Sequence, residues 1–92
     1  MKEIKDLIKS GVSIIDVRSA EEFREDHIST SINIPINEVV NRIDELKSIE
    51  QPFLVCSLSG RRSQQATEYL QSMNIKCFNA NGLKQLKNLM TD

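Results

Sequence analysis

Residues that define specialised classes of protein are scarce in this 92-residue chain, which has two cysteines, three glycines, two prolines and no tryptophan. Two cysteines are too few for a disulfide scaffold, so we expect a cytoplasmic protein whose thiols are reduced. No apolar run approaches the roughly 20 residues that cross a bilayer, and residues 1–6 lack the apolar stretch of a signal peptide. We therefore expect no membrane partner.

An excess of charge of either sign is also missing. The chain has 12 basic and 13 acidic residues, a formal net charge of −1 and no basic stripe, which argues against nucleic acid as a partner. No cluster has metal-ligand spacing and no glycine-rich nucleotide motif is present, so we expect no metal and no cofactor. The composition, 39% hydrophobic and 27% charged, is typical of a globular protein, and the length predicts a single domain over residues 1–92, expected to be a monomer.

Two hydrophobic periods alternate along the chain, one typical of helices and one typical of strands. Gly11 ends the first helical segment, the Ser-x-x-Glu pattern from Ser19 to Glu22 is a capping box that opens the second, and Pro35 starts the third. Strands that are nearly all apolar and separated by helices predict an α/β fold with four to five mainly parallel strands and helices on both faces. Helices are expected at about 4–8, 19–25, 35–46, 66–73 and 83–90, and strands at about 12–17, 32–34, 53–56 and 75–78.

The segment after the third predicted strand has the residues of an anion-binding loop. Cys56 is the last residue of that strand, and ligands of open parallel sheets bind beyond the carboxyl ends of the strands. The small residues that follow allow backbone N–H groups to turn inward, and the next helix and two arginines add positive charge. These features predict that Cys56 is a nucleophile with a pKa well below that of a free thiol. The expected anion-binding residues are Ser57, Leu58, Ser59, Gly60, Arg61 and Arg62.

Several short motifs follow one another from about residue 12 to the end, at 12–18, 21–23, 27–28, 32–35, 55–56, 59–63 and 79–83. Taken together and in this order, they resemble the motifs of the rhodanese domain. The resemblance implies the rhodanese fold and a single-domain sulfurtransferase of the thiosulfate type. Cys56 would take a sulfane sulfur from thiosulfate or another persulfide, become a persulfide, and pass the sulfur to a thiol or to cyanide. The implied partners are a small-molecule sulfur donor and a thiol acceptor, which includes a sulfur-carrier protein.

The sequence departs from the rhodanese pattern most in the length of this loop. Counted from Cys56, Arg62 is the sixth residue on, and the resulting Cys-x5-Arg loop is one residue longer than that of common sulfurtransferases. The longer loop is similar to that of rhodanese-fold phosphatases and arsenate reductases. If this chain had such an activity, Arg62 would bind oxyanion oxygens and Asp16 would be the nearby candidate for the general acid. In that case Arg62→Ala should weaken oxyanion use more than Arg61→Ala. Sulfur transfer is the leading interpretation, and a non-catalytic interaction module is the third.

Structural roles are expected for the remaining polar candidates. His27 would hold the turn before the second strand, and Arg18 would pair with Glu21 or Glu22 to fix the start of a helix. Asp16 would flank a strand end at the rim of the pocket. Cys77, inside an apolar strand, would be buried and inert rather than a resolving thiol. A further departure is Asn81, which replaces a glycine in the family's turn before the last helix.

Overall fold

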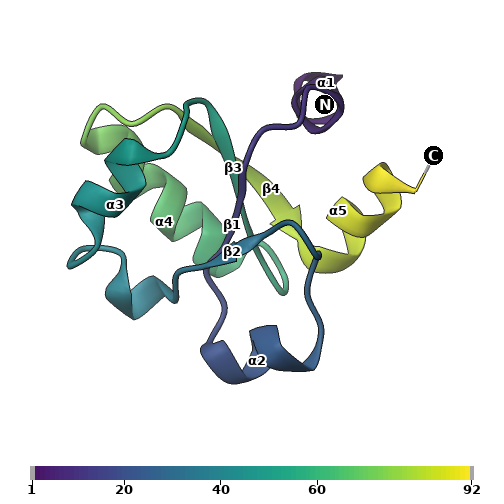
Figure 1. Ribbon diagram of the computed structural model, residues 1–92, viewed down its shortest axis with the longest axis horizontal. Coiled ribbons are helices and arrows are strands. Elements are labelled where there is room, and N and C mark those ends of the chain that lie inside the picture. Colours follow the sequence, from purple (N-terminus) through teal and green to yellow (C-terminus); the bar gives the residue numbers. More distant parts are fainter. Residues whose placement is uncertain (1, 92) are drawn as a thin grey trace.

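Four parallel strands in the order β2-β1-β3-β4 form the sheet of the computed structural model, which describes residues 2–91 (Figure 1). Neighbouring strands are in register through Ile15 with Ile32, Ile15 with Val55, and Phe53 with Cys77. The predicted α/β fold with a parallel sheet is confirmed, and no fifth strand occurs within residues 2–91. The strands are β1 (Ile14–Asp16), β2 (Ile32–Asn33), β3 (Phe53–Ser57) and β4 (Cys77–Gly82).

Helices cover both faces of the sheet, as predicted. α1 (Lys2–Lys9) and α5 (Leu83–Met90) lie on one face, and a 3-10 helix η1 (Ile36–Glu38), α3 (Ile43–Ser48) and α4 (Arg61–Ser72) lie on the other (Figure 1). The short α2 (Ala20–Glu25) lies below the carboxyl edge of the sheet and buries none of its residues. None of these helices has the length and apolar character needed to cross a bilayer.

The side chains of β3 alternate between two apolar cores. Phe53 and Val55 pack with Leu70 of α4, whereas Leu54 and Cys56 pack with Leu86 of α5 on the opposite face. Burial of each large apolar side chain stabilises the fold by about 1.5–3 kcal/mol. Because side chains of a strand alternate between faces, Ser57 points back toward α4 while Cys56 does not.

Local signals placed some helix ends correctly. The capping box is present: Ser19 Oγ accepts from the Glu22 N–H at 3.1 Å, and Glu22 Oε1 accepts from the Ser19 N–H at 3.0 Å. The first helix ends before Gly11, which has a φ of 79°, in the left-handed region that glycine tolerates.

The expected continuous helix from Pro35 is wrong. The segment is divided into η1 and α3, and Val40, expected on the apolar face, is 59% exposed. Asn37 and Asn41 lower the helix propensity here, and the Arg42 guanidinium bonds to Glu38 and Glu45 on either side of the break.

Two strand boundaries also differ from the prediction, and both affect the site. β3 continues to Ser57, so Cys56 is not its last residue. β4 begins at Cys77 and runs through Gly82, where a turn was expected. Its register with β3 shifts between Val55 and Ser57, and Asn81 has a φ of 70°. Asparagine is one of the few residues that adopt this left-handed conformation readily, which accounts for its presence where the family has glycine.

Candidate functional site

The loop between β3 and α4 lies at the carboxyl edge of the sheet, as expected for a ligand site in a parallel α/β fold (Figure 1). Leu58 and Ser59 form its exposed tip, and Gly60 is the N-cap of α4 with a φ of 96°. A Cβ at Gly60 would lie 3.2 Å from the Asn81 Cα, so both the conformation and the space at this position favour glycine. The loop is therefore held closely against β4.

The side-chain oxygen of Ser57, the last residue of β3, lies at the centre of the loop. Its Oγ accepts hydrogen bonds from the backbone N–H groups of Gly60 and Ser63, each at 3.1 Å. Ser63 Oγ lies 3.0 Å from Ser57 Oγ and donates to Asn79 Oδ1 at 2.6 Å, so the Ser57 hydroxyl donates to Ser63. Ser57 is only 1% exposed. The serine oxygen thus already fills the cradle of N–H groups that was expected to hold an anion or a charged sulfur.

Cys56 does not have the environment that was predicted for it. Its side chain is fully buried in the apolar cluster of Leu54, Ala80 and Leu86. The pKa of the Cys56 thiol is raised to about 12, mainly by burial and also by nearby Asp16, while Arg18 opposes the increase. The predicted low pKa and solvent-facing thiol are therefore wrong, because the side chain points to the face of the sheet opposite the loop.

The buried Asp16–Arg18 ion pair lies beside Cys56. Asp16 is opposite Cys56 in the register of β1 and β3. Its carboxylate accepts from Arg18 Nε at 3.0 Å and from Nη2 at 2.8 Å, and both residues are buried. The expected pairing of Arg18 with Glu21 or Glu22 is wrong. Asp16 is not at an exposed rim, so it is badly placed to serve as a general acid.

The two arginines after Gly60 have different surroundings. Arg62 forms a bidentate ion pair with Glu22 of α2, with Nη1–Oε1 at 2.8 Å and Nη2–Oε2 at 3.0 Å. This pair, together with the hydrogen bond from the Ser19 N–H, lowers the pKa of Glu22 to about 2. Arg61 is exposed, and its side chain makes no hydrogen bond or ion pair with the rest of residues 2–91. Arg61 is thus the loop charge that remains available to a ligand.

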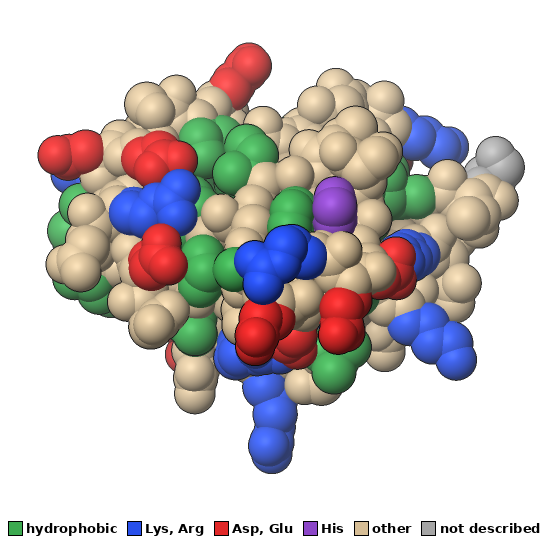
Figure 2. Space-filling model, turned by 60° about the horizontal axis from the view of Figure 1, so that its bottom comes forward, with side chains coloured by type: hydrophobic (Ala, Val, Ile, Leu, Met, Phe, Trp, Pro, Cys, Tyr) green, Lys and Arg blue, Asp and Glu red, His purple; other side chains and the backbone are tan. Residues whose placement is uncertain are grey.

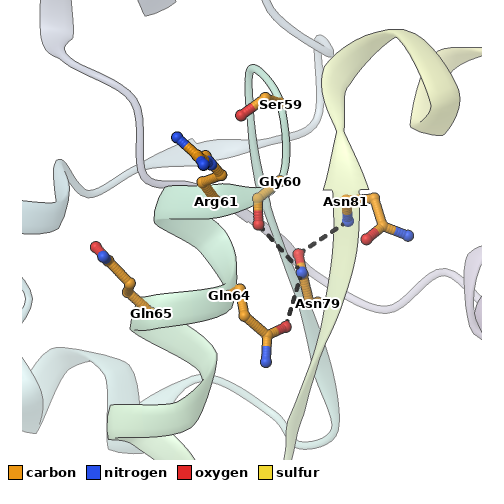
Figure 3. A pocket seen from close by; sticks show the side chains of 7 residues that line it. All are labelled: Ser59, Gly60, Arg61, Gln64, Gln65, Asn79 and Asn81. Carbon is orange, nitrogen blue, oxygen red and sulfur yellow. Dashed lines mark hydrogen bonds between the residues drawn. The ribbon is translucent and has the colours of Figure 1, made fainter.

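A polar hollow of about 580 Å³ lies beside this loop. Figure 3 shows the Asn79 side chain extending from β4 toward α4, hydrogen-bonded to Gly60, Gln64 and Asn81, while the Arg61 side chain points away from Asn79. Asn79 thereby holds the loop, and Arg61 supplies the charge of the hollow. The lining residues are Ser59, Gly60, Arg61, Gln64, Gln65, Asn79 and Asn81.

The face that carries the site has no uniform charge. Figure 2, in which the bottom of Figure 1 comes forward, shows acidic and basic side chains interspersed. Within residues 2–91, no group of three or more His, Cys, Asp or Glu residues is placed to hold a metal ion. The local charge available to an anion is therefore provided by individual residues of the loop.

The remaining candidates are accounted for structurally. His27 stacks on Phe23 with ring centroids 3.8 Å apart, and its Nδ1 lies 2.6 Å from the Phe23 carbonyl oxygen. Cys77 is buried, and burial raises its pKa to about 11. Sequence reasoning missed the site roles of Glu22, Ser63 and Asn79; Glu22 was noted only in the capping box and as a possible partner of Arg18.

The close approach of Gly82 to the loop yields a prediction. A Cβ at Gly82 would lie 2.6 Å from the Leu58 carbonyl oxygen, so Gly82→Ala must displace backbone atoms. We expect the free energy of unfolding to fall by about 1–3 kcal/mol, measured by urea denaturation. Lys84→Ala, at an exposed position of α5, is the matched control, and an equal effect of both changes would contradict the assignment.

Comparison with known proteins places these features in context. The model of the rhodanese-like domain family matches residues 1–89. The chain is 38% identical over 74 residues to the thiosulfate sulfurtransferase PspE of Escherichia coli. The aligned region covers 78% of this chain and 71% of PspE. It is 35% identical over 65 residues to "Putative sulfur carrier protein YrkF" of Bacillus subtilis, covering 71% of this chain. The match spans only 35% of the length of that second relative.

Solved structures share the fold. A rhodanese from E. coli with anions superposes with a TM-score of 0.73 at 36% identity, covering 82% of this chain and 91% of that one. The human single-domain sulfurtransferase TSTD1 has a TM-score of 0.73 at 26% identity, covering 100% of this chain and 94% of the other.

Proposed function

This chain belongs to the rhodanese-like domain family, and we propose that it binds a small sulfur oxyanion, such as thiosulfate, at the β3–α4 loop without forming a persulfide. The observation that carries the proposal is the place of Ser57 in the N–H cradle, with the only nearby thiol, Cys56, packed in the core. A serine hydroxyl at this point keeps the hydrogen bonds that shape the loop but lacks the thiolate that sulfur transfer requires.

The loop length supports the same assignment. Counted from Ser57, Arg62 is the fifth residue on, which gives the shorter spacing that the common sulfurtransferases have. The extra residue found by counting from Cys56 therefore disappears when Ser57 takes the nucleophile position. Phosphatase or arsenate chemistry is disfavoured, because that longer spacing was its main support and because Arg62 and Asp16 are both paired.

The oxyanion would bind in the polar hollow beside the loop, outside the N–H groups that Ser57 Oγ already occupies. The polar hollow borders Ser59, Gly60 and Arg61, and the first turn of α4 has N–H groups without partners within the helix. These donors, the positive end of the helix and the Arg61 charge favour an anion at this position.

The two arginines should contribute unequally to binding. We expect Arg61→Ala to weaken thiosulfate binding about three- to tenfold, since it removes an available charge, and Arg62→Ala to have little effect, since Glu22 already neutralises that residue. Dissociation constants from nuclear magnetic resonance titrations of the two variants would measure this. A larger loss in Arg62→Ala would contradict this assignment and favour Arg62 as the residue that binds the anion.

Thiosulfate titration of the isotope-labelled wild-type protein tests the proposed function. We expect saturable shifts of the amide signals of residues 58–63 and no thiocyanate when cyanide is added. An absence of saturable shifts in the loop at millimolar thiosulfate would overturn the proposal, and so would thiocyanate production by wild-type protein.

Sulfur transfer through Cys56 is the second candidate, favoured by the relationship to the thiosulfate sulfurtransferase PspE. Here the thiolate would attack the sulfane sulfur of thiosulfate, the S–S bond of thiosulfate would break, and sulfite would leave. An acceptor thiol, cyanide or a sulfur-carrier protein would then take the outer sulfur. This route requires Cys56 to leave the core, and its signature is thiocyanate production that Cys56→Ala abolishes.

A further inference from the structure

The ion pair between Glu22 and Arg62 joins two parts of the chain that are 40 residues apart in sequence. Both contacts are short, at 2.8 and 3.0 Å, and match the two carboxylate oxygens with two guanidinium nitrogens. Arginine binds sulfur and phosphorus oxyanions through this same fork of donors. The Glu22 carboxylate therefore occupies the group on Arg62 that a bound oxyanion would use.

The pair is placed where a ligand could compete for it. The Arg62 and Glu22 side chains are 35% and 31% exposed, so neither is sealed in the core. Arg62 is in the first turn of α4, directly after Arg61, which lines the polar hollow. Separation of the pair would also expose little apolar surface, because no residue of α2 is buried.

We infer that Glu22 is an internal competitor for the loop's anionic ligand: it holds Arg62 in an ion pair and thereby lowers the affinity of the loop for oxyanions. The inference rests on the proposed function, which supplies the ligand class. Glu22 determines how many arginine charges the ligand meets, one in the wild-type protein and two when the carboxylate is removed.

Glu22→Gln tests this inference with little disturbance of the helix. Glutamine also serves at the third helical position of a capping box, so the start of α2 should be preserved. We expect Glu22→Gln to bind thiosulfate about two- to fivefold more tightly than wild type in the amide titration, the range set by a partly exposed ion pair. Glu21→Gln removes the same charge from the exposed neighbouring residue and should have a smaller effect.

A double-mutant cycle separates release of Arg62 from a general loss of negative charge. In the Glu22→Gln background, Arg62→Ala should abolish the gain in affinity, whereas in the wild-type background it should change affinity little. A gain that persists in the double variant, or an equal gain in Glu21→Gln, would overturn the inference. Urea denaturation of each variant would show whether changes in affinity reflect changes in folding.

The outcomes distinguish this inference from the proposed function. If wild type binds thiosulfate at the loop and Glu22→Gln binds no more tightly, the competitor role alone is wrong. If only Glu22→Gln binds, the competitor role is supported and the wild-type function is revised. If neither protein binds, both are overturned.

Discussion

Replacement of Ser57 by cysteine is expected to create thiosulfate:cyanide sulfurtransferase activity. The new sulfur would lie where Ser57 Oγ now accepts from the Gly60 and Ser63 N–H groups, at the start of α4. These donors and the positive end of the helix stabilise a thiolate and lower the pKa of a cysteine so placed. We expect thiocyanate production to rise about 100-fold or more over wild type, because loss of a nucleophile commonly costs several orders of magnitude.

The control for this gain is the neighbouring cysteine. Ser57→Cys combined with Cys56→Ala should be as active as Ser57→Cys alone, since Cys56 points to the other face of the sheet. The placement of Ser57 at the nucleophile position would be contradicted if the Ser57→Cys protein were inactive although its urea denaturation curve showed that it is folded.

The second large effect concerns the reactivity of Cys56 itself. With a pKa raised to about 12 and a buried side chain, Cys56 should react with iodoacetamide at pH 8 about 1000-fold or more slowly than in the unfolded chain. Peptide mapping of alkylation in the presence and absence of urea would measure the ratio. Rapid native-state alkylation of Cys56 with a midpoint below pH 8 would contradict this account.

The same pKa value predicts how stability depends on pH. A thiol whose pKa is higher in the folded than in the unfolded protein stabilises the fold below the unfolded pKa, and that contribution is lost as pH rises toward the folded pKa. For Cys56 the window is from about 9 to about 12, and Cys77 adds a smaller term up to about 11. The free energy of unfolding should therefore fall above pH 9, and Cys56→Ala should make that fall less steep.

The sheet and most helices were predictable because their signals are local. The capping box at Ser19 and the helix-ending Gly11 depend on residues within a few positions of one another. The break between η1 and α3 was missed because the apolar spacing of Val39, Ile43 and Leu46 also suits one helix, and only the structure shows Val40 in solvent.

The direction of Cys56 was not predictable from the same pattern. Residues 53–56 are all apolar or small, so they contain no alternation that says which side chains face α4 and which face α5. A shift of one residue in a strand moves every side chain to the other face. The interpretation that placed the Cys56 side chain at the ligand site thus assumed an orientation of the strand that the residue pattern does not indicate. The contact of Glu22 with Arg62 was missed because it is non-local.

The most direct test of the central claim, that Ser57 and not Cys56 occupies the centre of the loop, is intact-protein mass spectrometry after incubation with thiosulfate. We expect no added sulfur on the wild-type protein. We expect one added sulfur atom, removable by cyanide, on the double variant Ser57→Cys with Cys56→Ala. A cyanide-removable sulfur on wild-type protein that disappears in Cys56→Ala would contradict the account and establish Cys56 as the sulfur carrier.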